Sequence, residues 1–179
     1  IEKYVNNKPC ALLDKKVTQS LAQEAESIRS LKLLDTCANI MLPDTAGIMK
    51  DLHVFAKQHD YTVLIFYDPT CSHCQVELPK MDSIIKLLEN QLVVRIGKFT
   101  VCNNMTLQVD VWKNFINEHH LDHNYMHVHL GNNIEIRKAY DAYTNPIFYL
   151  INKEGRLIGK KISTNTLRKI LISYIQTGK

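Results

Sequence analysis

The sequence lacks three features that would quickly assign it to a functional class. No apolar run is long enough to cross a membrane as a helix. The formal net charge is only +4, with lysine and arginine spread along the chain, so nothing favours binding to nucleic acid. The one CxxC pair, Cys71 and Cys74, has no second pair to complete a four-cysteine zinc site. We therefore expect no spanning segment, no nucleic-acid partner and no resident metal.

The length bounds the domain organisation. The chain has 179 residues, 45% of them hydrophobic, enough for one full domain with a proper core and an appendage. Apolar residues spaced by three and four across residues 14–34 predict an amphipathic helix ahead of that domain. We predict that residues 1–36 are an N-terminal helical segment or the tail of an upstream domain, and that residues 37–179 are the main domain. The start at Ile1, without a signal-peptide pattern, indicates a mature or trimmed fragment.

One stretch, residues 61–81, carries the chemistry. Val63 to Tyr67 form an apolar, β-branched and aromatic run that predicts a strand buried on both faces, and the run stops at Asp68-Pro69. Cys71 and Cys74 follow at once, and the apolar residues after them recur at helical spacing. The sequence thus predicts a dithiol at the N-terminus of a helix.

That position favours disulfide chemistry. Free backbone N–H groups and the positive end of the helix dipole stabilise a thiolate at Cys71, and a neighbouring imidazole, His73, adds to this. A thiolate is the attacking species in disulfide exchange, and Cys74 can reach back to resolve the mixed disulfide. A lone CxxC can also be half of a zinc site or a passive structural disulfide, and both alternatives stay open.

The segment Asp68-Pro69-Thr70-Cys71-Ser72-His73-Cys74, with Glu77 and Pro79 behind it, resembles the active-site segment of the thioredoxin superfamily. It is similar in particular to the TlpA/ResA-like branch, in the form common among Bacteroides-type bacteria. The resemblance extends from about Thr36 to the C-terminus. It implies an α/β, thioredoxin-like fold, in which helices flank a central mixed β-sheet. It also implies an N-terminal β-hairpin, a TlpA-type strand-helix insertion, and a location in the periplasm or cell envelope.

Periodicity and turn residues predict the remaining elements. We expect a β-hairpin within residues 38–52, strands at 92–99, 126–130, 146–151 and 157–162, helices at 52–58, 109–119 and 165–175, a helical turn at 134–140, and a hairpin turn at 152–155.

A second landmark is Pro146, which opens an apolar strand, where proline is tolerated. By resemblance it is the cis-proline that lies against the CxxC pair in this superfamily. The resemblance further implies that the preceding residue offers its backbone groups to an extended substrate. Many TlpA-like proteins carry threonine there, whereas this chain has Asn145. We expect Asn145, Pro146, Ser72 and His73 to contact the substrate.

Glu77 has two interpretations. It is either an exposed carboxylate in the first turns of a helix or, as the resemblance implies, a partly buried proton acceptor near Cys74. Plain thioredoxins carry a buried aspartate on the preceding strand, where this chain has Ile65, so Glu77 is the available substitute. We name Cys71, Cys74 and Glu77 as the candidate catalytic residues.

Histidine and the other cysteines leave alternatives open. Five of the eight histidines, His119, His120, His123, His127 and His129, fall close together, as a metal site would require, but no acidic residue or cysteine is arranged with them as a ligand set. The alternative is a polar helix end followed by a strand with alternating faces. The remaining three cysteines are Cys10, Cys37 and Cys102. They are free thiols, or Cys10 and Cys37 form a disulfide.

These residues predict a thiol-disulfide oxidoreductase that reduces or exchanges disulfides in envelope proteins. Cys71 would be the nucleophile and Cys74 the resolving thiol. No cofactor is needed, because the dithiol itself carries the two electrons. The partners would be proteins with disulfides or thiols and a separate redox protein, and the resemblance allows a lipoprotein anchor upstream. Two alternatives stay open: a copper or other metal chaperone that uses the CxxC pair, and a non-catalytic binding module of a larger lipoprotein.

Overall fold

The protein is built on a mixed sheet of five strands in the order β5-β4-β3-β6-β7. The computed structural model describes residues 31–104, 106–121 and 125–177. The strands are β3 (Tyr61–Tyr67), β4 (Ile96–Cys102), β5 (Tyr125–His129), β6 (Ile147–Asn152) and β7 (Leu157–Gly159). The first three run parallel, β6 is antiparallel to β3, and β7 is antiparallel to β6. The predicted α/β fold with a central mixed sheet is confirmed.

Strand β3 is the centre of the sheet, as its sequence predicted. It pairs with β4 on one side and β6 on the other. Its side chains alternate between two cores, because successive residues of a strand point to opposite faces. Val63, Ile65 and Tyr67 lie in one core cluster, and Leu64 and Phe66 lie in the other. The continuous apolar run is therefore the mark of a strand covered on both faces.

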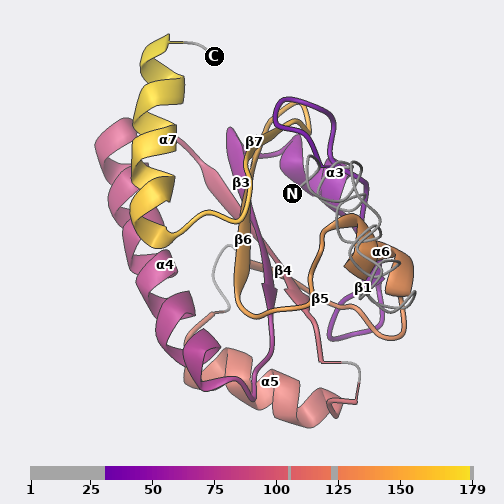
Figure 1. The fold of residues 1–179 in the computed structure, drawn as a ribbon. Helices are drawn as coiled ribbons and strands as arrows, with labels where there is room; N and C mark the ends of the chain where they lie inside the picture. The colour runs from indigo at the N-terminus through magenta and orange to yellow at the C-terminus, as the bar shows by residue number, and fades with distance from the viewer. Residues whose placement is uncertain (1–30, 105, 122–124, 178–179) are drawn as a thin grey trace, which may run out of the picture.

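Helices cover both faces of the sheet (Figure 1). The helices α4 (Ser72–Leu92), α5 (Val109–Glu118) and α7 (Thr164–Thr177) bury their apolar residues in the first cluster. Figure 1 shows α4 and α7 packed side by side. The short helices α3 (Leu52–Ala56) and α6 (Ile134–Ala139) lie on the other side and pack against the second cluster. The segment α5-β5-α6 between β4 and β6 provides the predicted insertion.

The predicted hairpin is present and covers one edge of the sheet. It consists of β1 (Met41–Pro43) and β2 (Met49–Asp51), which pair antiparallel. Just after β1, Asp44 forms a bridge with Val128 of β5. The opposite edge is covered by the chain before the hairpin, since Leu34 N–H donates to the carbonyl of Leu157. Both outer strands thus have a neighbouring chain segment along part of their free edge.

The element boundaries differ from the prediction in three main places, one of which is strand β7, predicted to reach residue 162 but ending at Gly159. Strand β4 was predicted at residues 92–99, but α4 continues to Leu92, and Val93 ends it in the left-handed conformation with φ of 54°. Leucine and valine suit a helix end as well as a strand start, so the pattern could not separate them. The predicted helix at residues 14–34 lies mostly outside the described residues, and residues 31–34 form a bend and turn. The domain division at residues 36 and 37 stays a prediction.

Candidate active site

The dithiol lies at the junction between β3 and α4, as predicted. Asp68 shapes the turn, because its Oδ1 accepts hydrogen bonds from the Thr70 N–H at 2.9 Å and the Thr70 hydroxyl at 2.8 Å. Cys71 is the N-cap residue of α4, and no side chain caps this end of the helix. The Cys71 sulfur therefore lies beside the positive end of a helix of 21 residues.

The two thiols have different environments. Cys71 is partly exposed, whereas Cys74 is fully buried within the first core cluster. Both are free thiols. Burial, with a smaller contribution from the neighbouring Cys71, raises the pKa of Cys74 to about 12, because a thiolate loses its hydration there. Cys74 is thus a protonated thiol at neutral pH, and Cys71 is the sulfur that an external disulfide can reach.

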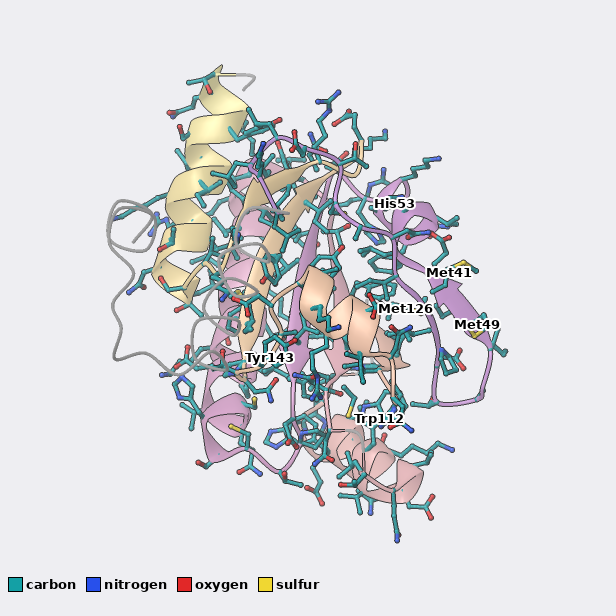
Figure 2. All side chains as sticks on the ribbon, turned by 45° about the vertical axis from the view of Figure 1, so that its right-hand side comes forward. Met41, Met49, His53, Trp112, Met126 and Tyr143 are labelled. Carbon is teal, nitrogen blue, oxygen red and sulfur yellow. The ribbon has the colours of Figure 1, made fainter. Side chains whose placement is uncertain are left out.

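The segment that carries Asn145 and Pro146 lies against the dithiol. The Cys71 thiol donates to the backbone carbonyl of Asn145, with a sulfur-to-oxygen distance of 3.9 Å across 74 residues of sequence. The Asn145–Pro146 peptide bond is cis, as the resemblance implied. Two residues earlier, Tyr143 exposes 58% of its surface. Figure 2 shows Tyr143 well separated from the exposed Met41 and Met49 of the hairpin.

The other predicted site residues, Ser72, His73 and Glu77, lie in the first two turns of α4. Ser72 and His73 are exposed in the first turn of α4, where an approaching protein could contact them. Glu77 follows Cys74 by three residues on α4, so both lie on one face of the helix. Its carboxylate, 20% exposed, accepts a hydrogen bond from the Lys80 ammonium at 2.8 Å. Glu77 is therefore half-buried and ion-paired in the reduced protein.

A polar network beside the dithiol was not predicted. Asn103, buried at the end of β4, donates through Nδ2 to the Ala142 carbonyl at 2.7 Å and to Asn145 Oδ1 at 3.1 Å. Arg137 of α6 donates in turn to Asn103. The neighbouring Asn104 donates to the Asp68 carboxylate at 3.2 Å. The only signal in the sequence was the pair of asparagines at the end of a parallel strand, where sites commonly form.

The dithiol rests on a buried aromatic layer. The Tyr67 hydroxyl accepts a hydrogen bond from Trp112 Nε1 at 2.7 Å, so α5 is joined to the end of β3. Figure 2 marks Trp112 at the end of the molecule where α5 lies. Cys102, next to Tyr67 in the sheet, is buried, and burial raises its pKa to about 12. Cys102 is therefore an inert core thiol at neutral pH.

The clustered histidines do not converge in the part of the chain that the structure describes. The His127 ring contacts the Thr100 hydroxyl at 2.6 Å and the Leu121 carbonyl at 2.7 Å. His129 accepts from the Gly131 N–H at 2.9 Å, and His119 packs on Phe115. His123 lies outside the described residues. Among the described residues, no three His, Cys, Asp or Glu side chains are grouped so that they could hold a metal ion. Nor is any helix within those ranges long and apolar enough to cross a membrane.

No protein-family model matches the chain, and no curated protein matches it either. Solved structures do match. A domain of a possible thiol-disulfide isomerase from Cytophaga hutchinsonii has a TM-score of 0.70 at 25% identity, over 82% of this chain and 95% of that one. A thioredoxin-like protein from Bacteroides caccae has a TM-score of 0.75 at 18% identity, over 95% of this chain and 59% of that one. A thiol:disulfide interchange protein from Bacteroides sp. has a TM-score of 0.67 at 19% identity, over 84% of this chain and 94% of that one.

The fold is therefore thioredoxin-like, with a dithiol at the position where a strand of the central sheet leads into a helix. Among proteins of this fold, the chain is similar to bacterial proteins named as thiol-disulfide oxidoreductases, many of them from Bacteroides species. The resemblance identified in the sequence is confirmed.

Proposed function

We propose that the protein is a thiol-disulfide oxidoreductase that reduces or exchanges disulfides in other proteins. The observation that carries the proposal is the asymmetry of the dithiol. Cys71 is partly exposed at a helix N-terminus, and Cys74 is fully buried one helical turn behind it. This arrangement provides one sulfur for attack and a second for resolution.

In the first step, the Cys71 thiolate attacks one sulfur of a substrate disulfide. A new bond forms between Cys71 Sγ and that sulfur, and the other substrate sulfur leaves as a thiolate, which takes a proton from water. The α4 N-terminus stabilises negative charge at Cys71 before the attack. The product of this step is a mixed disulfide between Cys71 and the substrate.

In the second step, Cys74 loses its proton and attacks Cys71 Sγ. The Cys71–Cys74 disulfide forms, the second substrate thiolate leaves, and the substrate has gained two electrons from the protein. Because the pKa of Cys74 is about 12, this step needs a base. We propose Glu77 as that base, since it lies on the same face of α4 and is half-buried. To act on Cys74, the carboxylate must leave the Lys80 ammonium.

We propose that the substrate binds along the segment of Asn145 and Pro146, with Ser72 and His73 at the other side of Cys71. The Asn145 carbonyl already faces Cys71, so a substrate strand that pairs with Asn145 would bring its cysteine to the reacting sulfur. Tyr143 lies within about 7 Å of Asn145, Cα to Cα, because only one residue separates them. An exposed tyrosine in this position offers a substrate a large, rigid contact surface.

The proposed partners are proteins with disulfides or thiols and a separate redox protein that returns the dithiol to its starting state. No cofactor is required for the electron transfer, since the two sulfurs carry the electrons. The similarity to thiol-disulfide oxidoreductases of Bacteroides species favours the periplasm or cell envelope, where disulfides persist. An anchor upstream of this chain would be compatible with that location.

The test is turnover of a protein disulfide. Insulin is incubated with dithiothreitol and the wild type, Cys71→Ser, Cys74→Ser or, as a matched control, Cys37→Ala, whose sulfur lies buried in the second core cluster. We expect catalysis by the wild type and by Cys37→Ala, and rates at the uncatalysed level for the two dithiol variants. Copper binding at the CxxC pair without turnover would instead support a metal chaperone. Neither turnover nor copper binding would support a binding module.

A further inference from the structure

The polar network around Asn103 joins three segments that are distant in sequence. Asn103 itself is 5% exposed, yet its side chain has hydrogen-bond partners for both of its polar atoms. Its Nδ2 donates to the Ala142 carbonyl and to Asn145 Oδ1. Two of these bonds therefore hold the two ends of the segment 142–145, which leads into Pro146.

Arg137 holds Asn103 from the other side. Its Nη2 donates to the Asn103 backbone carbonyl at 2.7 Å and to Asn103 Oδ1 at 2.8 Å, and its Nε donates to Oδ1 at 3.2 Å. Since the oxygen of the Asn103 amide is engaged by the guanidinium, the amide nitrogen is directed toward the segment 142–145. A planar group with several donors is required for this, and a lysine could not reproduce it.

The network ends at the dithiol. The backbone carbonyl of Asn145 accepts the Cys71 thiol, and the side chain of the same residue accepts Asn103. The chain of contacts thus runs from Arg137 on α6, through Asn103 at the end of β4, to the residue that faces Cys71. The two reaction steps proposed above use neither Arg137 nor Asn103.

We propose that Arg137 and Asn103 form a brace that positions the Asn145 carbonyl against Cys71. They are positioning residues, because neither contacts the dithiol directly. The brace has two consequences. It keeps a hydrogen-bond acceptor beside the reduced Cys71 thiol, and it fixes the backbone to which a substrate strand would pair. The second consequence rests on the proposed function, whereas the first does not.

Two pairs of variants test the brace against matched controls. Asn103→Ala removes its central amide. Asn152→Ala is its control, because Asn152 is an equally buried asparagine with hydrogen bonds to Glu154, Arg156 and Tyr174, at the other end of β6. Arg137→Lys keeps the charge but loses the fork, and Lys138→Ala is its neighbouring exposed control. Urea unfolding of all four variants records the change in stability.

The first readout is alkylation of reduced Cys71 by iodoacetamide, followed on its own peptide by mass spectrometry. We expect Asn103→Ala to raise the alkylation rate about threefold, because the thiol loses its acceptor. Arg137→Lys should give a smaller increase, and Asn152→Ala and Lys138→Ala should give none, even where they unfold at lower urea. Equal rates for Asn103→Ala and Asn152→Ala would overturn the brace and leave Asn103 a structural residue.

The second readout is the equilibrium of the Cys71–Cys74 dithiol with dithiothreitol. Loss of the acceptor destabilises the reduced form, so Asn103→Ala should shift the equilibrium about threefold toward the disulfide. The insulin assay separates this inference from the proposed function. A changed alkylation rate without turnover by the wild type would keep the brace and reject the oxidoreductase. Turnover by the wild type, with no response of Asn103→Ala in either readout, would keep the oxidoreductase and reject the brace.

Discussion

Two polar clusters, one on strand β4 and one just beyond its end, have different roles. The first, near its start, is ionic: Lys98, 1% exposed, donates to the Asp82 carboxylate of α4 at 3.1 Å. Tyr125 donates to the same carboxylate at 3.0 Å, and its ring lies 4.5 Å from the Lys98 ammonium. The second, at its end, is the neutral amide of Asn103 with Arg137. The first cluster joins α4 to the sheet, and the second faces the dithiol.

The comparison indicates which cluster governs stability and which governs the site. A charged pair in the core must be complete, because either partner alone would be a buried charge without compensation. The amide of Asn103 lies at the carboxyl ends of the parallel strands, between helix α6 and the segment 142–145, at the end of the sheet where sites form. We therefore expect changes at Lys98 to alter unfolding and changes at Asn103 to alter the reactivity of Cys71.

The largest expected effect is on stability. Asp82→Ala should lower the free energy of unfolding by about 3–5 kcal/mol, because it leaves Lys98 buried without its counter-charge. The double change Asp82→Leu with Lys98→Met should restore most of that loss, because an apolar pair can replace a buried ion pair. Urea unfolding followed by circular dichroism measures both. If the double variant were as unstable as Asp82→Ala, the lost stability would come from the ion pair itself and not from leaving Lys98 buried without a counter-charge.

The next largest effect is at the dithiol. Glu77→Gln should slow resolution of the mixed disulfide about a hundredfold at pH 7, because the buried Cys74 thiol loses its proton acceptor. Stopped-flow single turnover measures this rate, with Lys80→Gln as the control that releases Glu77 from its ion pair. Lys80→Gln should leave resolution as fast as in the wild type or make it faster. An unchanged rate in Glu77→Gln would show that the Glu77 carboxylate only pairs with Lys80 and takes no part in resolution.

A smaller effect is expected in how folding stability depends on pH, which should involve Asp82 of the ionic cluster. Burial would raise the pKa of Asp82, but the Lys86 and Lys98 ammonium groups outweigh it and hold the pKa below its ordinary value. The folded pKa is thus below the unfolded one. Asp82 therefore contributes stability above the unfolded value of about 4, which is lost as the pH falls through the folded pKa. Stability measured from pH 7 to pH 2 should fall less steeply in Asp82→Asn than in the wild type, and Glu118→Gln, an exposed control, should follow the wild type.

The smallest expected effect concerns substrate binding. Tyr143→Ala should raise the KM for a protein disulfide by about three- to tenfold with kcat little changed, since an exposed aromatic contact contributes about 1 kcal/mol. Tyr143→Phe should behave like the wild type. The rate with a small disulfide such as oxidised glutathione provides the control, because a small molecule does not extend to Tyr143. A fall in kcat instead would place Tyr143 in the brace rather than on the binding surface.

Local patterns could predict much of the fold. The strand β3, the dithiol and the start of α4 are contiguous, so periodicity and turn residues are enough to place them. Strand β4 was displaced from its predicted position, because Leu92 and Val93 fit the end of a helix as well as a strand. Lys98 was not recognised as a core residue, since only the packing of α4 places Asp82 beside it.

The site could be predicted only where it is local or covered by a resemblance. The two thiols are three residues apart, and Pro146 was placed by its likeness to a known superfamily. The contacts among Asn103, Arg137 and Asn145 depend on how helix α6 and two loops meet after the sheet has formed. No spacing in the sequence records that meeting, and so the brace could be found only in the folded chain.

Trapping of a mixed disulfide shows directly whether Cys71 is the attacking thiol. Reduced Cys74→Ser, which lacks the resolving thiol, is incubated with a protein that has one accessible disulfide, and the adduct is mapped by mass spectrometry. We expect a single covalent complex joined through Cys71 and released by dithiothreitol, and none with Cys71→Ser. A complex joined through any other cysteine, or no complex at all, would contradict the assignment of Cys71 as the attacking thiol.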